Sequence, residues 1–132
     1  MDIKKLQDAA VNASKTAYVP YSDFQVGAAL LTIDGKIFEG CNIENASFGL
    51  TNCAERTAIF KAISDGEEKG DFVALAVYGE KAVKPISPCG ACRQVMAEFF
   101  DKDLPVYLIS KHLEVKKTTV EELLPYQFDE LN

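Results

Sequence analysis

The sequence contains no apolar run near the roughly 20 residues that a membrane-spanning helix requires. Residues 1–8 carry no apolar core of the kind that signal peptides have. Cations are also few: 14 Lys and Arg stand against 20 Asp and Glu, which gives a net charge of −6. Binding to a polynucleotide backbone needs clustered Lys and Arg, and no such cluster is visible. We therefore expect a cytoplasmic protein without membrane or nucleic-acid partners.

Histidine and cysteine are sparse as well. The single histidine, His112, lies in a polar turn with no partner motif, so we expect a solvated side chain. Four cysteines are present, and clustered cysteines in a reducing compartment more often bind a metal or react than form disulfides. The 132 residues are 48% hydrophobic and 26% charged, which predicts one globular domain over residues 1–132.

Hydrophobic spacing and breaker residues predict an alternation of helices and strands. Helices are expected over residues 2–17, 53–64, 89–100 and, as a short turn, 120–124. Thr51 or Asn52 is the expected N-cap of the second helix. Strands are expected over residues 25–33, 36–42, 72–78, 105–109 and 115–119, the first two joined by a hairpin turn at Asp34-Gly35. This order predicts an α/β fold with one mixed sheet and helices on its faces.

Three cysteines and one glutamate form the most informative pattern in the chain. Glu55 follows Cys53 after one residue, and Pro88 precedes the pair Cys89 and Cys92. The two cysteines of this pair lie three positions apart at a helix start and can therefore point to the same side. Cys53 also begins a helix, where unpaired backbone N–H groups stabilise a thiolate. Three thiolates suit zinc and leave its fourth position open, which distinguishes catalytic from structural zinc.

Other interpretations of these cysteines remain open at this point. A Cys-x-x-Cys pair by itself could be a redox pair or half of a structural zinc module. A structural site needs a fourth ligand, for which Cys41 is the only spare cysteine. Cys41 ends an apolar strand, and we expect it to be buried as a small hydrophobic side chain.

Charge balance draws attention to Arg56, the residue after Glu55. A zinc ion with three thiolates carries a net charge of about −1, which should make a bound water less acidic than at sites with neutral histidine ligands. We expect Arg56 to offset this charge by donating hydrogen bonds to one or more cysteine sulfurs. The alternative is an ordinary arginine on a helix surface.

The joint pattern of Cys-x-Glu and Pro-Cys-x-x-Cys resembles that of the zinc-dependent deaminases. Beyond the metal pattern, the chain is similar to the homotetrameric cytidine deaminase family from about residue 6 to residue 128. The stretches that carry the similarity are 24–29, 40–46, 51–56 and 87–94. The resemblance implies a three-layer α-β-α domain with a mixed five-stranded sheet. It also implies one zinc per subunit and hydrolytic deamination of cytidine and deoxycytidine in pyrimidine salvage, with release of ammonia.

The resemblance also implies roles for individual residues. Cys53, Cys89 and Cys92 would hold the zinc. Glu55 would take a proton from the attacking water, pass it to N3 of cytosine and then help protonate the departing ammonia. The remaining assignments concern the substrate: backbone contacts with the base near Ala54 and Ser87, packing by Phe24, and ribose hydroxyls bound by Asn42 and Glu44.

The substrate assignment has some independent support. Asn42 and Glu44 lie two apart at a strand end, so their side chains can point the same way, and an amide with a carboxylate suits a sugar diol. Without the resemblance, a pair of solvated loop residues would be the simpler interpretation. Phe48 stands where many relatives have tyrosine, so no hydroxyl is available at that position.

The C-terminal segment is short, and the resemblance implies that one of its aromatic side chains stacks on the base in a neighbouring subunit. Phe128 is the best match and Tyr126 the weaker one. The alternative is that Phe128 covers the core of its own subunit.

Two rival functions also stay open: a deaminase of antibiotic nucleosides of the blasticidin S type, and a structural zinc-binding module. The second leaves Glu55 without a role.

Overall fold

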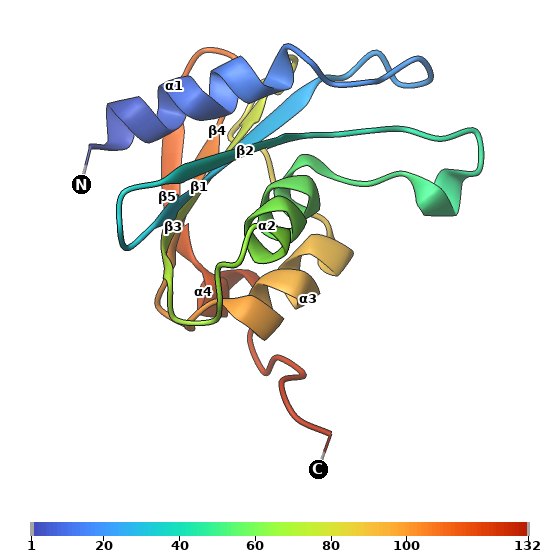
Figure 1. The fold of residues 1–132 in the computed structure, drawn as a ribbon. Coiled ribbons are helices and arrows are strands. Elements are labelled where there is room, and N and C mark those ends of the chain that lie inside the picture. Colours follow the sequence, from blue (N-terminus) through green and yellow to red (C-terminus); the bar gives the residue numbers. More distant parts are fainter. Residues whose placement is uncertain (1, 132) are drawn as a thin grey trace.

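A computed structural model of the protein describes residues 2–131. Its centre is a five-stranded sheet in the order β2-β1-β3-β4-β5 (Figure 1). The strands are β1 (Val26–Thr32), β2 (Ile37–Cys41), β3 (Phe72–Gly79), β4 (Pro105–Ile109) and β5 (Val115–Thr119). Only the β3–β4 pair is parallel within this sheet, and the other neighbours are antiparallel. The predicted mixed sheet is therefore confirmed.

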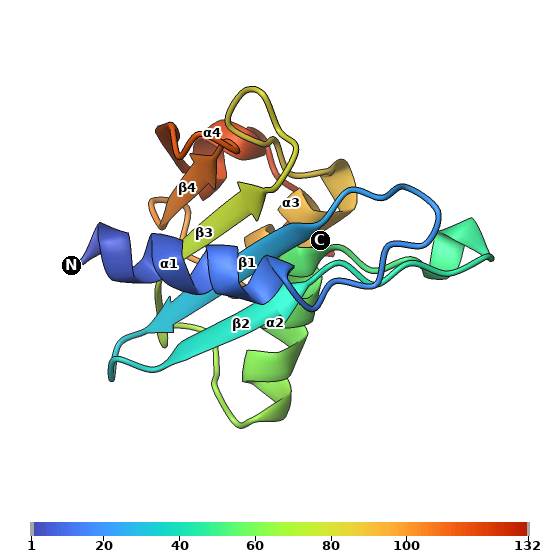
Figure 2. The same cartoon turned by 90° about the horizontal axis from the view of Figure 1, so that it is seen from above.

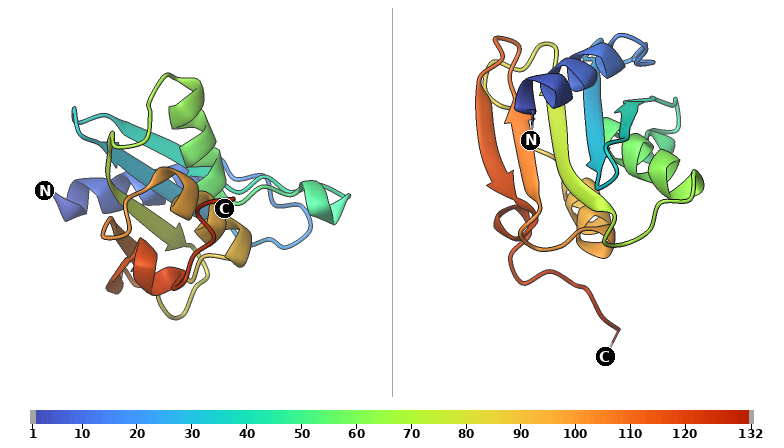
Figure 3. Two further views of the ribbon diagram at one scale, coloured as in Figure 1. Left: turned by 90° about the horizontal axis from the view of Figure 1, so that it is seen from below. Right: turned by 60° about the vertical axis from the view of Figure 1, so that its left-hand side comes forward.

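Helices cover both faces of the sheet, as the right-hand view of Figure 3 shows. Helix α1 (Ile3–Ser14) lies on one face, and helices α2 (Ala54–Ser64) and α3 (Gly90–Phe99) lie on the other. The short helix α4 (Val120–Leu123) follows β5 directly. Each face has its own apolar cluster: Leu6 and Tyr107 belong to the α1 side, and Met96 and Val106 to the other side.

Two glycines allow the helices to approach the sheet closely. A Cβ atom on Gly40 of β2 would lie 2.4 Å from Ala58 N and 2.7 Å from Ala54 O of helix α2. A Cβ on Gly27 of β1 would lie 1.9 Å from Ala10 O of helix α1. Gly40 therefore sets how closely the first turn of α2, which carries Glu55, can pack on the sheet.

Most predicted bounds agree with the structure, and two predictions are wrong. Helix α1 ends at Ser14, not at residue 17, because the next residues close a short turn in which Ala17 N donates to Ser14 O. Neither Thr51 nor Asn52 caps α2: the N-cap residue is Cys53, with no side-chain capping bond. The Asp34-Gly35 turn is confirmed, with Gly35 at φ 88° between antiparallel β1 and β2.

Two segments extend away from the layers. Residues 42–52 form an arm, stabilised by bridges that pair Ile43 with Tyr18 and with Asn52, and it contains the 3-10 turn η1 (Phe48–Leu50) (Figure 2). We call it the 42–52 arm. The C-terminal tail, residues 124–131, leaves α4 below the sheet in Figure 1.

Among residues 2–131, no helix is long and apolar enough to cross a membrane.

Candidate metal centre and active site

Two helix N-termini bring three cysteines together. Cys53 is the N-cap of α2, Cys89 is the N-cap of α3, and Cys92 lies in the first turn of α3. Their Sγ atoms all lie within 4.8 Å of one another, and those of Cys53 and Cys89 are 3.7 Å apart. Tetrahedral zinc with Zn–S bonds of about 2.3 Å places its sulfur ligands about 3.8 Å apart. The cluster therefore fits a zinc ion without rearrangement of the backbone.

The charge state of the cluster also suits a metal. The pKa of Cys53 is lowered to about 5, first by the hydrogen bond from the Cys92 thiol and then by the one from Arg56, against the opposing effect of burial. The pKa of Cys92 is raised, because its thiol donates to Cys53 and is buried. Cys53 is thus already a thiolate without metal, while Cys92 must lose its proton when a metal binds.

Arg56 lies against the sulfurs, as its predicted role requires. Its Nη2 donates to Cys53 Sγ at 3.5 Å, and this bond raises the pKa of the guanidinium further. The Nε atom of Arg56 is buried, and within the described residues it has no hydrogen-bond partner. Arg56 therefore has a spare N–H donor beside a cysteine cluster that gains negative charge when its thiols lose their protons. That Arg56 tunes the metal remains a prediction.

Glu55 is a buried carboxyl at the start of α2, with 4% of its surface exposed. Burial raises its pKa to about 7, and the negative charge of Cys53 adds to the rise. A hydrogen bond from the backbone of Glu55 and the positive charge of Arg56 counter part of this rise. A carboxyl that titrates near neutrality beside an open metal position can both accept and donate a proton.

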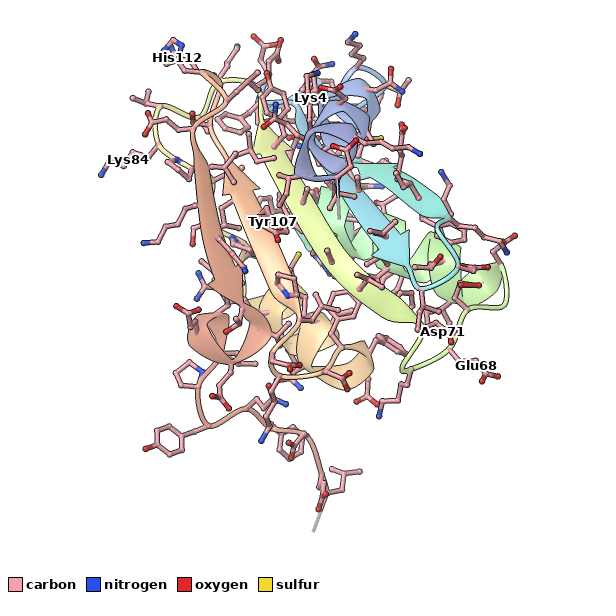
Figure 4. The ribbon with its side chains drawn as sticks, turned by 90° about the vertical axis from the view of Figure 1, so that its left-hand side faces the viewer. Lys4, Glu68, Asp71, Lys84, Tyr107 and His112 are labelled. Atoms are coloured by element: carbon pink, nitrogen blue, oxygen red, sulfur yellow. The ribbon has the colours of Figure 1, made fainter. Side chains whose placement is uncertain are left out.

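Two candidates from the sequence lie outside the metal cluster. Cys41 is not among the three clustered cysteines; its Sγ accepts from Thr16 Oγ1 at 3.7 Å. The expectation that Cys41 is buried is wrong, because the side chain is only half-buried at the end of β2. His112 is exposed at the turn between β4 and β5 and points away from the sheet (Figure 4).

The predicted sugar ligands both turn toward the segment 21–26. Glu44 accepts from the backbone N–H groups of Tyr21 and Ser22 at 3.0 and 3.1 Å and from the Ser22 hydroxyl. The Ser22 hydroxyl is the main reason that the pKa of Glu44 is lowered. Asn42 accepts from Val26 N at 2.9 Å and donates to Phe24 O at 2.8 Å. Asn42 therefore fixes the backbone around Phe24, a structural role that the sequence did not suggest.

The other predicted substrate contacts lie next to the N-termini of α2 and α3 or in the C-terminal tail. Ala54 is fully buried at the first position of α2, while Ser87 is exposed just before α3. Phe128 is 62% exposed, and its backbone oxygen accepts from Gln94 Nε2 at 2.7 Å. The alternative that Phe128 covers the core of its own chain finds no support in this exposure. Phe48 is exposed on the 42–52 arm.

Sequence reasoning missed two residues that support the site. Ser22 holds Glu44, and Arg93 donates to Ser87 and Pro88 just before Cys89 of the cysteine cluster. Nothing in the sequence marks Ser22. Arg93 had a weak signal: it lies directly after Cys92, four positions after Cys89, and so shares the first turns of α3 with the ligands.

The fold and the cluster together define a zinc-binding deaminase of the α-β-α class, and comparison with known proteins specifies the family. The family model described as the cytidine and deoxycytidylate deaminase zinc-binding region matches residues 1–108, which include all three cysteines and Glu55. The chain belongs to this family.

The relatives are similar over almost the whole chain. A protein named cytidine deaminase from Sporosarcina psychrophila is 55% identical over 97% of this chain and 92% of its own length. The crystal structure of cytidine deaminase from Burkholderia pseudomallei is 52% identical, has a TM-score of 0.94, and is matched over 97% of this chain and 100% of that chain. The blasticidin-S deaminase of Bacillus cereus is more distant, at 32% identity over 78% of this chain and 76% of its own length.

Proposed function

We propose that the protein is a zinc-dependent hydrolase that deaminates cytidine and deoxycytidine to uridine and deoxyuridine with release of ammonia. The observation that carries the proposal is the buried carboxyl of Glu55, whose pKa is raised to about 7 beside the three-cysteine cluster. The 55% identity to a protein named cytidine deaminase supports the choice of substrate. A structural zinc module would have no use for a destabilised carboxyl at this position.

The residues of the chain perform the proton transfers and the binding. A zinc ion held by the cysteines would supply the Lewis acid that makes a water molecule nucleophilic at neutral pH. Glu55 accepts a proton from that water and delivers it to N3 of cytosine as the water oxygen bonds to C4. Glu55 then takes the remaining proton from the new C4 hydroxyl and gives it to the amino group, which leaves as ammonia while the C4 carbonyl forms. Together with the Cys92 thiol, Arg56 favours the thiolate form of Cys53 through its 3.5 Å contact with the sulfur.

The sugar binds at the base of the 42–52 arm. Ser22 and the backbone around it hold the Glu44 carboxylate, and the lowered pKa of Glu44 keeps the group ionised. A carboxylate has about four acceptor sites, so it can still accept from a ribose hydroxyl. Asn42 uses one of its two amide protons on Phe24 and keeps the other for the sugar.

A panel of substrates tests this function directly. Zinc-loaded protein is incubated with cytidine, deoxycytidine, CMP, adenosine and blasticidin S, and ammonia release is followed. We expect turnover of cytidine and deoxycytidine and none with the Glu55→Gln variant, which serves as the matched control. Turnover of blasticidin S alone would favour the antibiotic deaminase instead. Absence of turnover with every cytosine nucleoside would refute the proposed function.

The proposed working form is a cytoplasmic homotetramer of pyrimidine salvage in which neighbouring subunits complete each site. Its support is the apolar surface that the isolated chain leaves uncovered on the 42–52 arm and in the tail, where Phe48 is 87% and Phe128 62% exposed. Apolar surface of this kind is typical of subunit contacts. Analytical ultracentrifugation of the purified protein tests the assembly: sedimentation as a monomer at the concentrations used in the assay would contradict it.

A further inference from the structure

The guanidinium of Arg93 donates in three directions at once. Its Nε donates to Pro88 O at 2.8 Å, its Nη1 to Leu123 O at 2.7 Å and its Nη2 to Ser87 Oγ at 2.6 Å. The three acceptors are neutral: two are backbone carbonyls and one is a hydroxyl. Arg93 is therefore used here for the geometry of its planar fork, which a lysine ammonium cannot reproduce.

The local structure explains how one side chain reaches all three acceptors. Arg93 lies in the first turns of α3, where long side chains turn back toward the helix N-terminus. Its fork thus passes the N-cap residue Cys89 and meets the two residues before it. The third acceptor, Leu123 O, is the last carbonyl of α4, which no bond within that helix can satisfy. The left-hand view of Figure 3 shows α3 beside α4.

The hydrogen bonds that hold the segment before α3 come from Arg93, while Ile86 packs against the core and Pro88 is buried. Residues 83–88 join β3 to α3 without regular structure, and in the described chain the hydrogen bonds that reach them come from Arg93. Pro88 is buried, whereas Ser87 and Cys89 are exposed on the side of the site. The positions of the Cys89 sulfur and of the Ser87 backbone both depend on this segment.

We propose that Arg93 is a positioning residue for the site: its fork ties Ser87 and Pro88 to helix α4 and so places the Cys89 ligand for the metal. The anchor at Leu123, which is 8% exposed, belongs to the apolar core below α2 and α3. The backbone N–H of Cys92 already holds the Cys89 sulfur from within α3, and Arg93 adds a link from the two preceding residues to α4. For the metal, the inference rests on the cysteine cluster alone; for the substrate, it rests on the proposed function.

Zinc release tests the inference without any turnover. Zinc-loaded protein is mixed with an excess of a chromophoric chelator, and the rate of metal transfer is measured for Arg93→Gln, Arg93→Lys and wild type. Loss of a group that bonds a metal-binding side chain commonly costs 10- to 100-fold in affinity; Arg93 acts through the residues before Cys89, so we expect release from Arg93→Gln to be faster by up to about 10-fold. Arg93→Lys keeps the charge but not the fork, and it is expected to release zinc faster than wild type as well.

Two control variants separate positioning from other effects. Lys117→Gln removes a positive charge from an exposed position of β5, and Ile109→Val creates a small defect in the core on the α1 side. Both should release zinc at the wild-type rate, although Ile109→Val lowers the melting temperature. If release follows melting temperature across all four variants, general destabilisation explains it and the proposal fails.

A second measurement holds even if Arg93→Gln folds poorly. Ser87→Ala removes the hydroxyl acceptor and should accelerate zinc release in the wild-type background, but much less in the Arg93→Lys background, because both changes break the same contact. KM for cytidine should rise in Arg93→Lys. Additive effects on zinc release, or release at the wild-type rate with an unchanged KM, would overturn the proposal. If zinc release were faster as expected but no protein, wild type included, deaminated cytidine, the role of Arg93 at the metal would stand and only the proposed function would be refuted.

Discussion

Glu55 shows how the proposed catalytic role conflicts with stability at the level of one residue. The carboxyl is buried, and its pKa of about 7 means that the folded protein binds its proton more tightly than the unfolded chain does. Between the ordinary pKa of 4.5 and about 7, the folded state carries the extra proton. Stability therefore falls as the pH rises through this window, and the loss is complete above it.

This conflict predicts that metal-free Glu55→Gln is more stable than the metal-free wild type at pH 8. The pKa difference from 4.5 to about 7 corresponds to about 3 kcal/mol. At pH 4, where the wild-type carboxyl is protonated in both states, the two proteins should be equally stable. Urea unfolding with chelator and reductant present, at both pH values, measures the difference. The same gap at pH 4 and pH 8 would show that ionisation of Glu55 is not its cause.

Arg56 supports a second prediction at the residue scale. Arg56→Gln removes the donor that lies 3.5 Å from Cys53 Sγ, so the pKa of Cys53 should rise and the metal should be held less tightly. We expect zinc affinity to fall about 10-fold or more and the deamination rate to fall with it. Metal content after dialysis against a graded series of chelator concentrations is the readout, with Lys117→Gln as the control for charge. If zinc content and deamination rate were both unchanged, Arg56 would be an ordinary helix arginine without a role at the metal.

At the scale of elements, the site exists because two helices begin at the same place. Cys53 and Cys89 are both N-cap residues, and each thiol lies where unpaired N–H groups and the helix dipole favour a negative charge. The sheet determines where these helix starts lie, and Gly40 allows α2 to pack directly on β2. The metal geometry is thus a consequence of helix packing, not of the loops alone.

Gly40→Ala should therefore damage both stability and the metal site. The added Cβ would meet Ala58 N at 2.4 Å and Ala54 O at 2.7 Å, both of them backbone atoms that cannot move aside alone. Forcing a group into a close-packed core typically costs about 1–3 kcal/mol, and here α2 must also shift away from the sheet. The matched control is Gly49→Ala, where the added Cβ meets nothing within 4 Å. Urea midpoints and bound zinc are measured together; a Gly40→Ala protein like Gly49→Ala in both would contradict the packing argument.

The sequence predicted what is encoded locally. Hydrophobic spacing and breaker residues predicted the helices and strands to within about three residues at each end, and the spacing of Cys89 and Cys92 placed two of the clustered cysteines on one helical turn. Contacts between distant segments left no such signal. Arg93 reaches Leu123, 30 residues later, and the amide of Asn42 closes on the backbone of Phe24. Both contacts depend on the tertiary fold, so a motif could indicate the clustered cysteines but not the residues that position them.

At the scale of the whole molecule, the apolar surface is unevenly distributed. Phe48 and Leu50 project from the 42–52 arm with 87% and 70% of their surface exposed, and Phe128 and Leu131 in the tail are 62% and 93% exposed. Meanwhile Gln94 holds the tail through Phe128 O, so the backbone is fixed while the aromatic ring is free. A ring held out in this way is suited to enter a site other than its own.

Subunit mixing gives the decisive prediction for the tail. Phe128→Ala keeps Glu55 but lacks the ring, whereas Glu55→Gln keeps the ring but cannot transfer protons, so each homo-oligomer should deaminate cytidine poorly. If the tail completes a neighbour's site, co-expressed subunits with different tags should form mixed assemblies in which some sites contain an intact Glu55 and a ring from the Glu55→Gln partner, and activity should partly return. The control pairs Phe128→Ala with the double variant Glu55→Gln/Phe128→Ala, in which no site regains a ring. Equal activity in the two mixtures, or full activity of Phe128→Ala by itself, would contradict a role for Phe128 in the site of a neighbouring subunit.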